Sequence, residues 1–222
     1  MFFESAHENA LPKAGDIQEL ARLSRDNNLT YNVHLPTDIS PGSSNALQQK
    51  AAVETICRVM DLAAPLYPTT CTLHIPLYST PDHGQGRDAW WGRLTAFFET
   101  IVRAGIDPRR ISIETLDYPI EWLNEILATF DLRICMDIGH LLVNHTDITK
   151  FYGAHSPRIA IVHLHGVDGN RDHLPLSVLS ENLMQSIVEV LSQFHGTVSL
   201  EVFQFQALNR SLNRLQETWG SR

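Results

Sequence analysis

LRICMDIGH (132–140) is followed, one helix length later, by IAIVHLHG (159–166). Both stretches are apolar at nearly every position rather than at every second one. This pattern is typical of strands in a parallel sheet, where helices cover one face and a packed interior covers the other. The segment between the two stretches has helical periodicity, so together they form one strand-helix repeat.

The same repeat continues in both directions along the chain, where short apolar and β-branched runs alternate with longer segments of helical periodicity. The predicted strands are 2–5, 30–36, 69–77, 110–116, 132–140, 159–166 and 197–203. The predicted helices are 16–27, 44–64, 88–104, 120–129, 147–155, 180–194 and 206–218. The chain therefore reads as seven strand-helix units, with loops at 41–44 and 79–88.

Regular parallel units form either a closed barrel or an open doubly wound sheet, and the lack of a Gly-rich phosphate turn favours the barrel. We predict one α/β domain over residues 1–222, a (β/α) TIM-type barrel. A full barrel needs eight strands. Because the chain opens on a strand at Phe2, the usual first unit is expected to be missing, through a late gene start or an incomplete barrel. A homodimer contact could cover the sheet edges left open.

Composition narrows the choice of partners. The net charge of −8 and the small number of lysines give no cationic face for a phosphate backbone, so we expect no nucleic acid partner. No apolar run approaches the roughly 20 residues that span a bilayer, so we expect no membrane partner. Cys57, Cys71 and Cys135 lack C-x-x-C spacing and indicate buried thiols in a reducing compartment. We predict a cytoplasmic protein.

Metal-binding side chains stand near the carboxyl ends of the predicted strands, where β/α barrels place their reactive groups. Every strand after the first supplies at least one such residue. Imidazole and carboxylate ligands suit zinc, manganese or iron, and a divalent cation would relieve the repulsion between converging carboxylates. The candidate ligands are His34, His74, Glu114, Asp137, His140, His163, His173 and Glu201.

Sequence spacing and apolar neighbours support a functional role for four of these candidates. Asp137 and His140 are three residues apart, and Gly139 between them permits a close approach. Glu114 and Glu201 lie in SIETL and SLEVF, where burying an unpaired carboxylate would cost several kcal/mol, so function is favoured over structure.

The remaining histidines leave alternatives open. A lone histidine near a strand end, such as His34 or His74, is more often a structural residue than a ligand. His163 and His165 alternate faces along one strand, so we expect only one to point into the barrel mouth and choose His163. The histidines expected to face solvent are His7, His83, His145, His155 and His195.

The candidate ligands and the motifs that contain them resemble those of the xylose-isomerase-like barrel superfamily. This superfamily includes sugar phosphate isomerases and epimerases and zinc-dependent AP endonucleases. In that superfamily four consecutive strands supply a Glu, Asp, His, Glu ligand set. Here IETL, MDIGH, VHLHG and LEVF supply Glu114, Asp137, His163 and Glu201 in that order. The resemblance covers nearly the whole chain and implies a metal enzyme.

The hydrolytic branch of the superfamily adds further histidines and an Asp/His pair. His34, His74, His140 and the pair Asp172-His173 are similar to those additions, although the endonucleases separate the pair by one residue. This surplus implies more than one divalent ion and a metal-dependent hydrolase that cleaves a phosphoric diester with metal-activated water.

The resemblance also implies individual roles. Glu114, Glu201 and His140 would be catalytic, and Asp172 would contact the substrate. Arg171 lies beside the proposed ligand loop and is predicted to hold a phosphate, although a single loop arginine is more often solvated. YNVHLPTDIS and VHLHG look like the cobamide-remodelling phosphodiesterase group, which implies hydrolysis of the cobamide nucleotide loop.

Two alternatives stay open. A sugar isomerase or epimerase with one ion would use Glu114 and Glu201 as proton-transfer bases, but it leaves the extra histidines without a task. A non-catalytic, metal-bearing binding barrel is the other.

Overall fold

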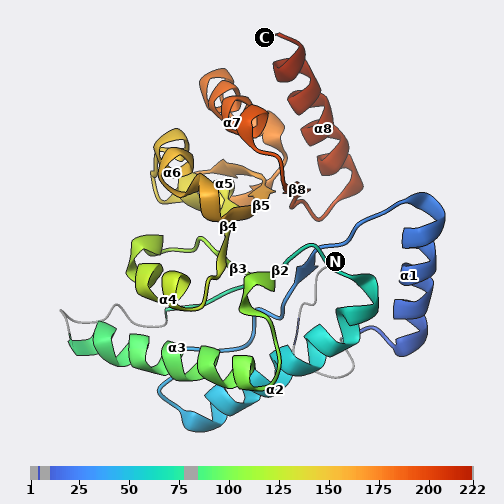
Figure 1. Cartoon of the computed structure of the whole chain (residues 1–222). Helices are drawn as coiled ribbons and strands as arrows, with labels where there is room; N and C mark the ends of the chain where they lie inside the picture. The colour runs from blue at the N-terminus through green and yellow to red at the C-terminus, as the bar shows by residue number, and fades with distance from the viewer. Residues whose placement is uncertain (1–4, 6–10, 78–84, 222) are drawn as a thin grey trace. The chain divides into compact units, whose positions relative to one another are not determined.

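The computed structural model describes Ser5, residues 11–77 and residues 85–221. The chain divides into two compact units, one made of Met1–Glu114 and Ile120–Arg133 and the other of Thr115–Pro119 and Ile134–Arg222. Each unit has its own parallel strands and helices, coloured along the chain in Figure 1. The expectation of a single domain over 1–222 stays a prediction.

The first unit contains three parallel strands in the order of the sequence, with Val33 opposite Cys71 and Cys71 opposite Ile111. The strands are β1 (Val33–His34), β2 (Cys71–Leu73) and β3 (Ile111–Glu114). The helices are α1 (Ala14–Asn27), α2 (Ala46–Ala63), α3 (Gln85–Arg103) and α4 (Asn124–Thr129), with 3-10 turns η2 (Ala64–Leu66), η3 (Pro108–Arg110) and η4 (Ile120–Leu123). Helices α2 and α3 pack side by side (Figure 1).

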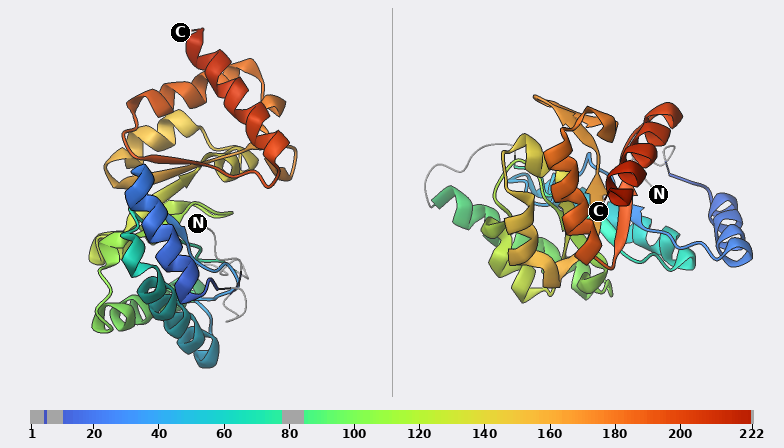
Figure 2. Two further views of the ribbon diagram at one scale, coloured as in Figure 1. Left: turned by 90° about the vertical axis from the view of Figure 1, so that its right-hand side faces the viewer. Right: turned by 90° about the horizontal axis from the view of Figure 1, so that it is seen from above.

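The second unit has three parallel strands and a separate antiparallel hairpin. The strands are β4 (Arg133–Asp137), β5 (Ile159–Leu164) and β8 (Thr197–Leu200), and the hairpin is β6 (Gly166–Asp168) with β7 (Arg171–Leu174). The helices are α5 (Ile138–Val143), α6 (Ile148–His155), α7 (Glu181–Gln193) and α8 (Phe205–Gly220), with 3-10 turns η5 (Ser156–Arg158) and η6 (Leu176–Val178). Figure 2 shows α7 and α8 packed together at the C-terminal end of the chain.

Local sequence explains where these helices begin. Asn45, Asp147 and Ser180 precede α2, α6 and α7, and each side chain accepts a hydrogen bond from a backbone N–H of the first turn. Such caps satisfy N–H groups that have no partner inside the helix. Strand side chains such as Ile113 and Ile161 are fully buried, as continuous apolar strands require.

The predicted strands from 30–36 onward each contain a strand of the structure, and the predicted helices are all present. The first predicted strand, 2–5, lies outside the described residues except for Ser5, as does most of the predicted loop 79–88. The predicted strand 132–140 is too long: β4 ends at Asp137 because its carboxylate caps α5, which begins at Ile138. The β6–β7 hairpin was not predicted, since RDHL is polar and has no apolar alternation.

Within the described ranges, no helix is long and apolar enough to cross a membrane.

Candidate metal centre

In the first unit, two histidines face one buried carboxylate. Glu114 ends β3 and is 1% exposed. Its Oε2 lies 3.0 Å from Nε2 of His34, at the end of β1, and 3.0 Å from Nε2 of His74, just after β2. Parallel neighbouring strands bring these three residues to the same end of the sheet.

The hydrogen bond of the His34 ring shows that the contact between His34 and Glu114 needs a positive charge. Its Nδ1 lies 2.9 Å from the carbonyl oxygen of Leu35 and must donate to it, so in the neutral ring Nε2 carries a lone pair. That lone pair faces the Glu114 carboxylate at 3.0 Å. Two electron-rich atoms at this distance need a proton or a metal cation between them, so the residues fit a divalent ion.

In the second unit, Asp137 stands at the junction of β4 and α5 and is fully buried. Its Oδ1 accepts a hydrogen bond from the backbone N–H of His140 at 2.7 Å. Its Oδ2 has no hydrogen-bond partner among the residues that the structure describes. Leaving a buried charged acceptor unsatisfied costs at least about 1–3 kcal/mol, and a bound cation would supply the missing partner.

His163 lies between Asp137 and a second carboxylate. Its Nδ1 is 3.9 Å from Asp137 Oδ2 and 3.1 Å from Oε1 of Glu201, which follows β8. The His163 side chain is almost fully buried, whereas that of Glu201 is 19% exposed. Two oxygen ligands and one imidazole nitrogen converging in this way form a donor set suited to zinc, manganese or iron.

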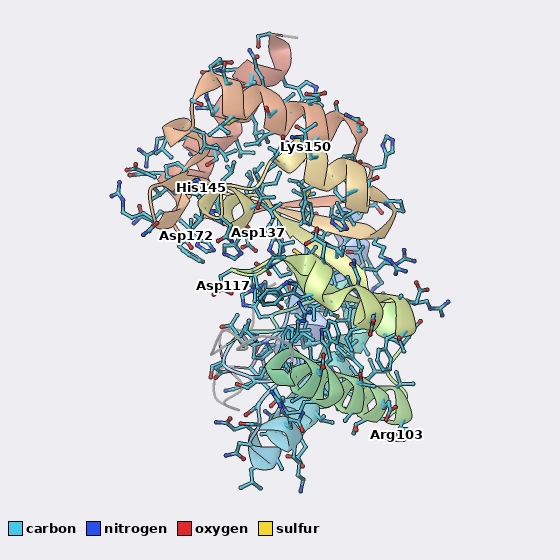
Figure 3. The ribbon with its side chains drawn as sticks, turned by 90° about the vertical axis from the view of Figure 1, so that its left-hand side faces the viewer. Arg103, Asp117, Asp137, His145, Lys150 and Asp172 are labelled. Atoms are coloured by element: carbon cyan, nitrogen blue, oxygen red, sulfur yellow. The ribbon has the colours of Figure 1, made fainter. Side chains whose placement is uncertain are left out.

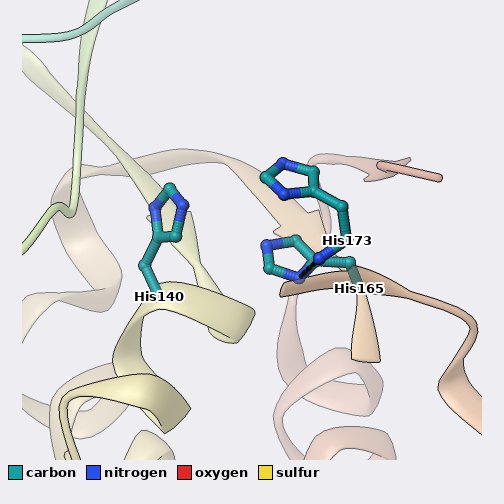
Figure 4. Close-up of side chains that lie close together, drawn as sticks. All are labelled: His140, His165 and His173. Atoms are coloured by element: carbon teal, nitrogen blue, oxygen red, sulfur yellow. Dashed lines mark hydrogen bonds between the residues drawn. The ribbon is translucent and has the colours of Figure 1, made fainter. Parts of the chain in front are cut away.

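Figure 4 shows a cluster of three histidines. Two of them, His140 and His165, lie close to the carboxylate of Asp137. His140, His165 and His173 each offer a ring nitrogen within 4.8 Å of the others. Nδ1 of His140 lies 3.0 Å from the carbonyl oxygen of Thr115, and Nδ1 of His173 lies 3.0 Å from Oδ1 of Asp172. When one ring nitrogen donates to a protein oxygen, the other is the one presented to a metal, as in most histidine metal sites.

His165 is the residue that strand alternation missed. The two-residue alternation applies only inside a strand, and β5 ends at Leu164. His165 therefore turns back towards the site, is fully buried, and places Nε2 3.2 Å from Asp137 Oδ1. The expectation that only one histidine of VHLHG reaches this region is wrong. The glycine that follows His165 is the sequence signal that the strand has ended.

The hairpin residues have local partners. Arg171 is exposed and its guanidinium pairs with Asp168 on the same hairpin. Asp172 is about half exposed, at the periphery of the second unit, whereas Asp137 lies further inside (Figure 3). The contact in which Asp172 accepts from Nδ1 of His173 supports an orienting role for this carboxylate. Substrate binding by Arg171 and Asp172 stays a prediction.

The other histidines lie outside these clusters. His145 and His195 are exposed, as expected, but His155 is half-buried with its ring 4.5 Å from that of Phe151. His7 and His83 lie outside the described residues.

Electrostatics around His173 favour a positive charge at this point. The carboxylate of Glu201, whose Oε2 lies 3.7 Å from Nε2 of His173, raises the pKa of His173 most. Burial of the ring lowers this pKa, and Asp172 raises it. The result is a pKa of about 9. Partial burial alone raises the pKa of Asp172, but the hydrogen bond and charge of His173 outweigh it and lower that pKa.

We expect the metal-free protein to hold a proton on His173 that a metal ion displaces. The pKa is raised from 6.5 to about 9, so the charged ring stabilises the fold fully below pH 6.5 and loses this effect as the pH rises through about 9. Zinc binding should then release a proton at neutral pH and tighten up to about pH 9. Calorimetry in buffers of different ionisation enthalpy measures the release. His173→Asn should abolish it and His195→Asn should not; equal release in both variants would contradict the prediction.

Replacing Gly139 should destabilise the second unit. A Cβ at this position would lie 2.0 Å from Cε1 of the buried His165 ring. Overpacking of this kind costs about 1–3 kcal/mol, which exceeds the helix-propensity gain of alanine over glycine, about 0.5–1 kcal/mol. Gly153→Ala in α6 is the matched control, because its Cβ would have nothing within 4 Å and should stabilise the protein. Urea unfolding of both variants tests this, and a Gly139→Ala protein as stable as Gly153→Ala would refute it.

Comparison with known proteins identifies the fold. The structure resembles a D-tagatose 3-epimerase-like protein, with 22% identity, a TM-score of 0.78, and coverage of 98% of this chain and 87% of that one. It also resembles endonuclease IV from Thermus thermophilus, with 14% identity, a TM-score of 0.68, and coverage of 96% and 84%. A second Thermus thermophilus protein, soaked with ZnCl2, has 22% identity, a TM-score of 0.70, and coverage of 97% and 86%.

At these identities the structural likeness shows the fold alone. No curated protein matches the sequence. The sequence pattern of one family, however, matches residues 1–218, which confirms the predicted fold class. The chain belongs to the xylose isomerase-like TIM barrel family.

Proposed function

We propose that the protein is a metal-dependent phosphodiesterase that acts on a small-molecule phosphoester. The observation that carries this proposal is the surplus of imidazoles around buried carboxylates. His34 and His74 face Glu114 in the first unit, and His140 and His173 accompany Asp137 in the second. A one-metal isomerase has no task for these four histidines, whereas phosphoester hydrolysis uses additional ions to neutralise charge and supply hydroxide.

The residues divide into ligand groups by unit. Glu114, His34 and His74 would hold an ion in the first unit. Asp137, His163 and Glu201 would hold one in the second, where His140 and His173 offer further nitrogen ligands. The four-ligand set implied by the family resemblance, Glu114 with Asp137, His163 and Glu201, stays a prediction.

The chain's own side chains would perform the remaining steps. Bound divalent ions would polarise the phosphoryl group and make water a nucleophile at neutral pH. Glu201 is partly exposed and lies against His163 and His173, so it can accept a proton from water in an open part of the second unit. His140, with Nδ1 bound to Thr115 and a partly exposed ring, would hold or release a proton at Nε2 whenever that nitrogen is not bound to an ion.

The acidic balance of the chain supports a small substrate over DNA. The likeness of YNVHLPTDIS and VHLHG to cobamide-remodelling phosphodiesterases makes a cobamide, cleaved at its nucleotide loop, the first substrate to test. Cys57, Cys71 and Cys135 form no disulfide in the described part of the chain, which supports the proposed cytoplasmic location. A homodimer stays part of the proposal.

A sugar isomerase or epimerase is the second candidate. The likeness to an epimerase-like protein favours it, as does the pairing of Asp137 and Glu201 around His163, because isomerisation uses one ion and carboxylate bases. This reaction would leave His34 and His74 as structural residues.

Metal content separates the two candidates before any substrate is known. We expect the purified protein to hold more than one equivalent of zinc, manganese or iron, and His74→Ala to lose about one of them, since the first-unit ion depends on this residue. Elemental analysis measures the content, with His195→Ala as the control for histidine loss alone. A single equivalent, unchanged in His74→Ala, would favour the isomerase.

Activity provides the direct test. The protein should hydrolyse a cobamide or the chromogenic diester bis(p-nitrophenyl) phosphate, and chelator treatment should abolish the reaction until metal is restored. Asp137→Asn keeps the cap of α5 through its carbonyl oxygen but weakens metal binding, so hydrolysis should fall at least about 100-fold with little loss of folding stability. Interconversion of ketoses without release of a phosphomonoester would overturn the phosphodiesterase proposal.

A further inference from the structure

We propose that His165 is a positioning residue rather than a metal ligand: its ring locks the Asp137 carboxylate and the His173 backbone into place. The inference deepens the proposed function, because it concerns the metal site of the second unit. It divides the three-histidine cluster into two ligands, His140 and His173, and one residue that orients the metal-binding groups.

Hydrogen bonding fixes the tautomer of His165. The backbone N–H of His173 can only donate, and it points at Nδ1 of His165 at 3.0 Å, so Nδ1 uses its lone pair as an acceptor. The carbonyl oxygen of Gly166 lies farther from Nδ1, at 3.3 Å, and receives no proton from a nitrogen that is already accepting one. A neutral imidazole then carries its proton on Nε2. His140 and His173 have the opposite arrangement, since Nδ1 of each faces an oxygen acceptor, which leaves Nε2 as the nitrogen that can bind an ion.

The proton on Nε2 of His165 points to Asp137. Nε2 lies 3.2 Å from Oδ1, and although the two atoms are not aligned for a hydrogen bond, the N–H edge attracts the carboxylate. Oδ1 also accepts the backbone N–H of His140. These two contacts fall on Oδ1, whereas Oδ2 has no hydrogen-bond partner among the described residues and lies 3.9 Å from Nδ1 of His163. Together with the backbone N–H of His140, His165 thus leaves Oδ2 as the carboxylate oxygen presented to an ion.

The surroundings of His165 hold its ring in one orientation. The ring stacks on that of His173, with centroids 4.3 Å apart and planes 10° from parallel (Figure 4). The ring also fills the space beside Gly139, where a Cβ would lie 2.0 Å from its Cε1. His165 is fully buried, so this space is closed to solvent. A ring packed this closely against two residues can orient its neighbours, because it has no room to rotate away from them.

His165 also supports an unfavourable backbone conformation. His173 has a φ of 51°, in the left-handed region that side chains other than glycine rarely adopt. The hydrogen bond from its N–H to His165 and the stacking of the two rings hold the hairpin in that conformation. The position of His173 therefore depends on His165 as well as on Asp172.

The tautomer can be measured in metal-free protein. Long-range ¹H–¹⁵N NMR of the histidine rings should show a neutral ring protonated on Nε2, and this signal should vanish in His165→Asn. A His165 ring protonated on Nδ1 would overturn the inference. This readout does not depend on metal binding or activity, so it decides the role of His165 even if the proposed function fails.

Metal affinity gives the second test. A positioning residue predicts that His165→Ala lowers zinc affinity about 10–100-fold while the number of zinc ions stays the same. Loss of one equivalent would identify His165 as a ligand, and unchanged affinity would show that it orients nothing; either result overturns the inference. His195→Ala, which removes an exposed histidine of the same unit, is the matched control.

Two conservative variants test the contacts of His165 with Asp137 and with His173 one at a time. They also serve as controls in case His165→Ala does not fold. His165→Asn keeps an acceptor for the His173 N–H but is too short to reach Asp137, whereas His165→Gln can reach Asp137 with an amide N–H. Partial recovery of affinity in both, relative to His165→Ala, is the expected result. Affinities no better than that of alanine in folded Asn and Gln proteins would overturn the two-contact assignment. If the wild-type protein binds no zinc, manganese or iron, the proposed function fails and the tautomer alone decides the inference.

Discussion

The carboxylate of Asp137 is the constraint on which the second unit depends. It ends a strand that is buried from Ile134 onward, and Oδ1 caps the helix that follows by accepting the N–H of His140. This cap turns the chain immediately after β4, so that His140 comes back beside the carboxylate that holds its own backbone. A buried carboxylate is costly unless its charge is compensated, and the residues around Asp137 supply that compensation in part.

The residues next to Asp137 offset part of the free-energy cost of burying its carboxylate. Gly139 leaves room for the His165 ring, whose N–H edge faces Oδ1, and His173 stacks on that ring from the β6–β7 hairpin. Glu201 approaches from β8 and raises the pKa of His173, so that a positive charge stands close to two carboxylates. A proton on His173 and a divalent cation are two ways of meeting the same electrostatic demand.

Hydrophobic periodicity in the sequence correctly predicted the positions of the parallel strands and most helices in the described part of the chain. It could not predict the positions of side chains that depend on a turn of the backbone. Continuous apolar runs such as IAIVHL located the strands because burial on both faces leaves no polar positions. They also placed His34, His74 and Glu114 at strand ends, where the structure brings them together. Alternation could not place His165, because the strand stops one residue before it, and RDHL carried no signal for a hairpin that positions His173. Tautomers depend on which backbone group faces each ring nitrogen, which no residue pattern records.

Each of the two units contains a buried carboxylate oxygen that needs a cation. In the first, His34 gives its Nδ1 proton to a carbonyl oxygen and therefore presents a lone pair to Glu114. In the second, His140 gives its Nδ1 proton to Thr115 beside a carboxylate oxygen that has no partner among the described residues. The His34 lone pair and the Glu114 carboxylate oppose each other with like partial charges, and the Asp137 oxygen is buried without a hydrogen bond from the described residues; folding alone would favour neither. The arrangement becomes favourable when a cation binds between them, because the cation accepts both lone pairs at once. The buried polar groups are thus best explained as ligands held ready by the fold, and metal binding would stabilise the protein as well as serve its chemistry.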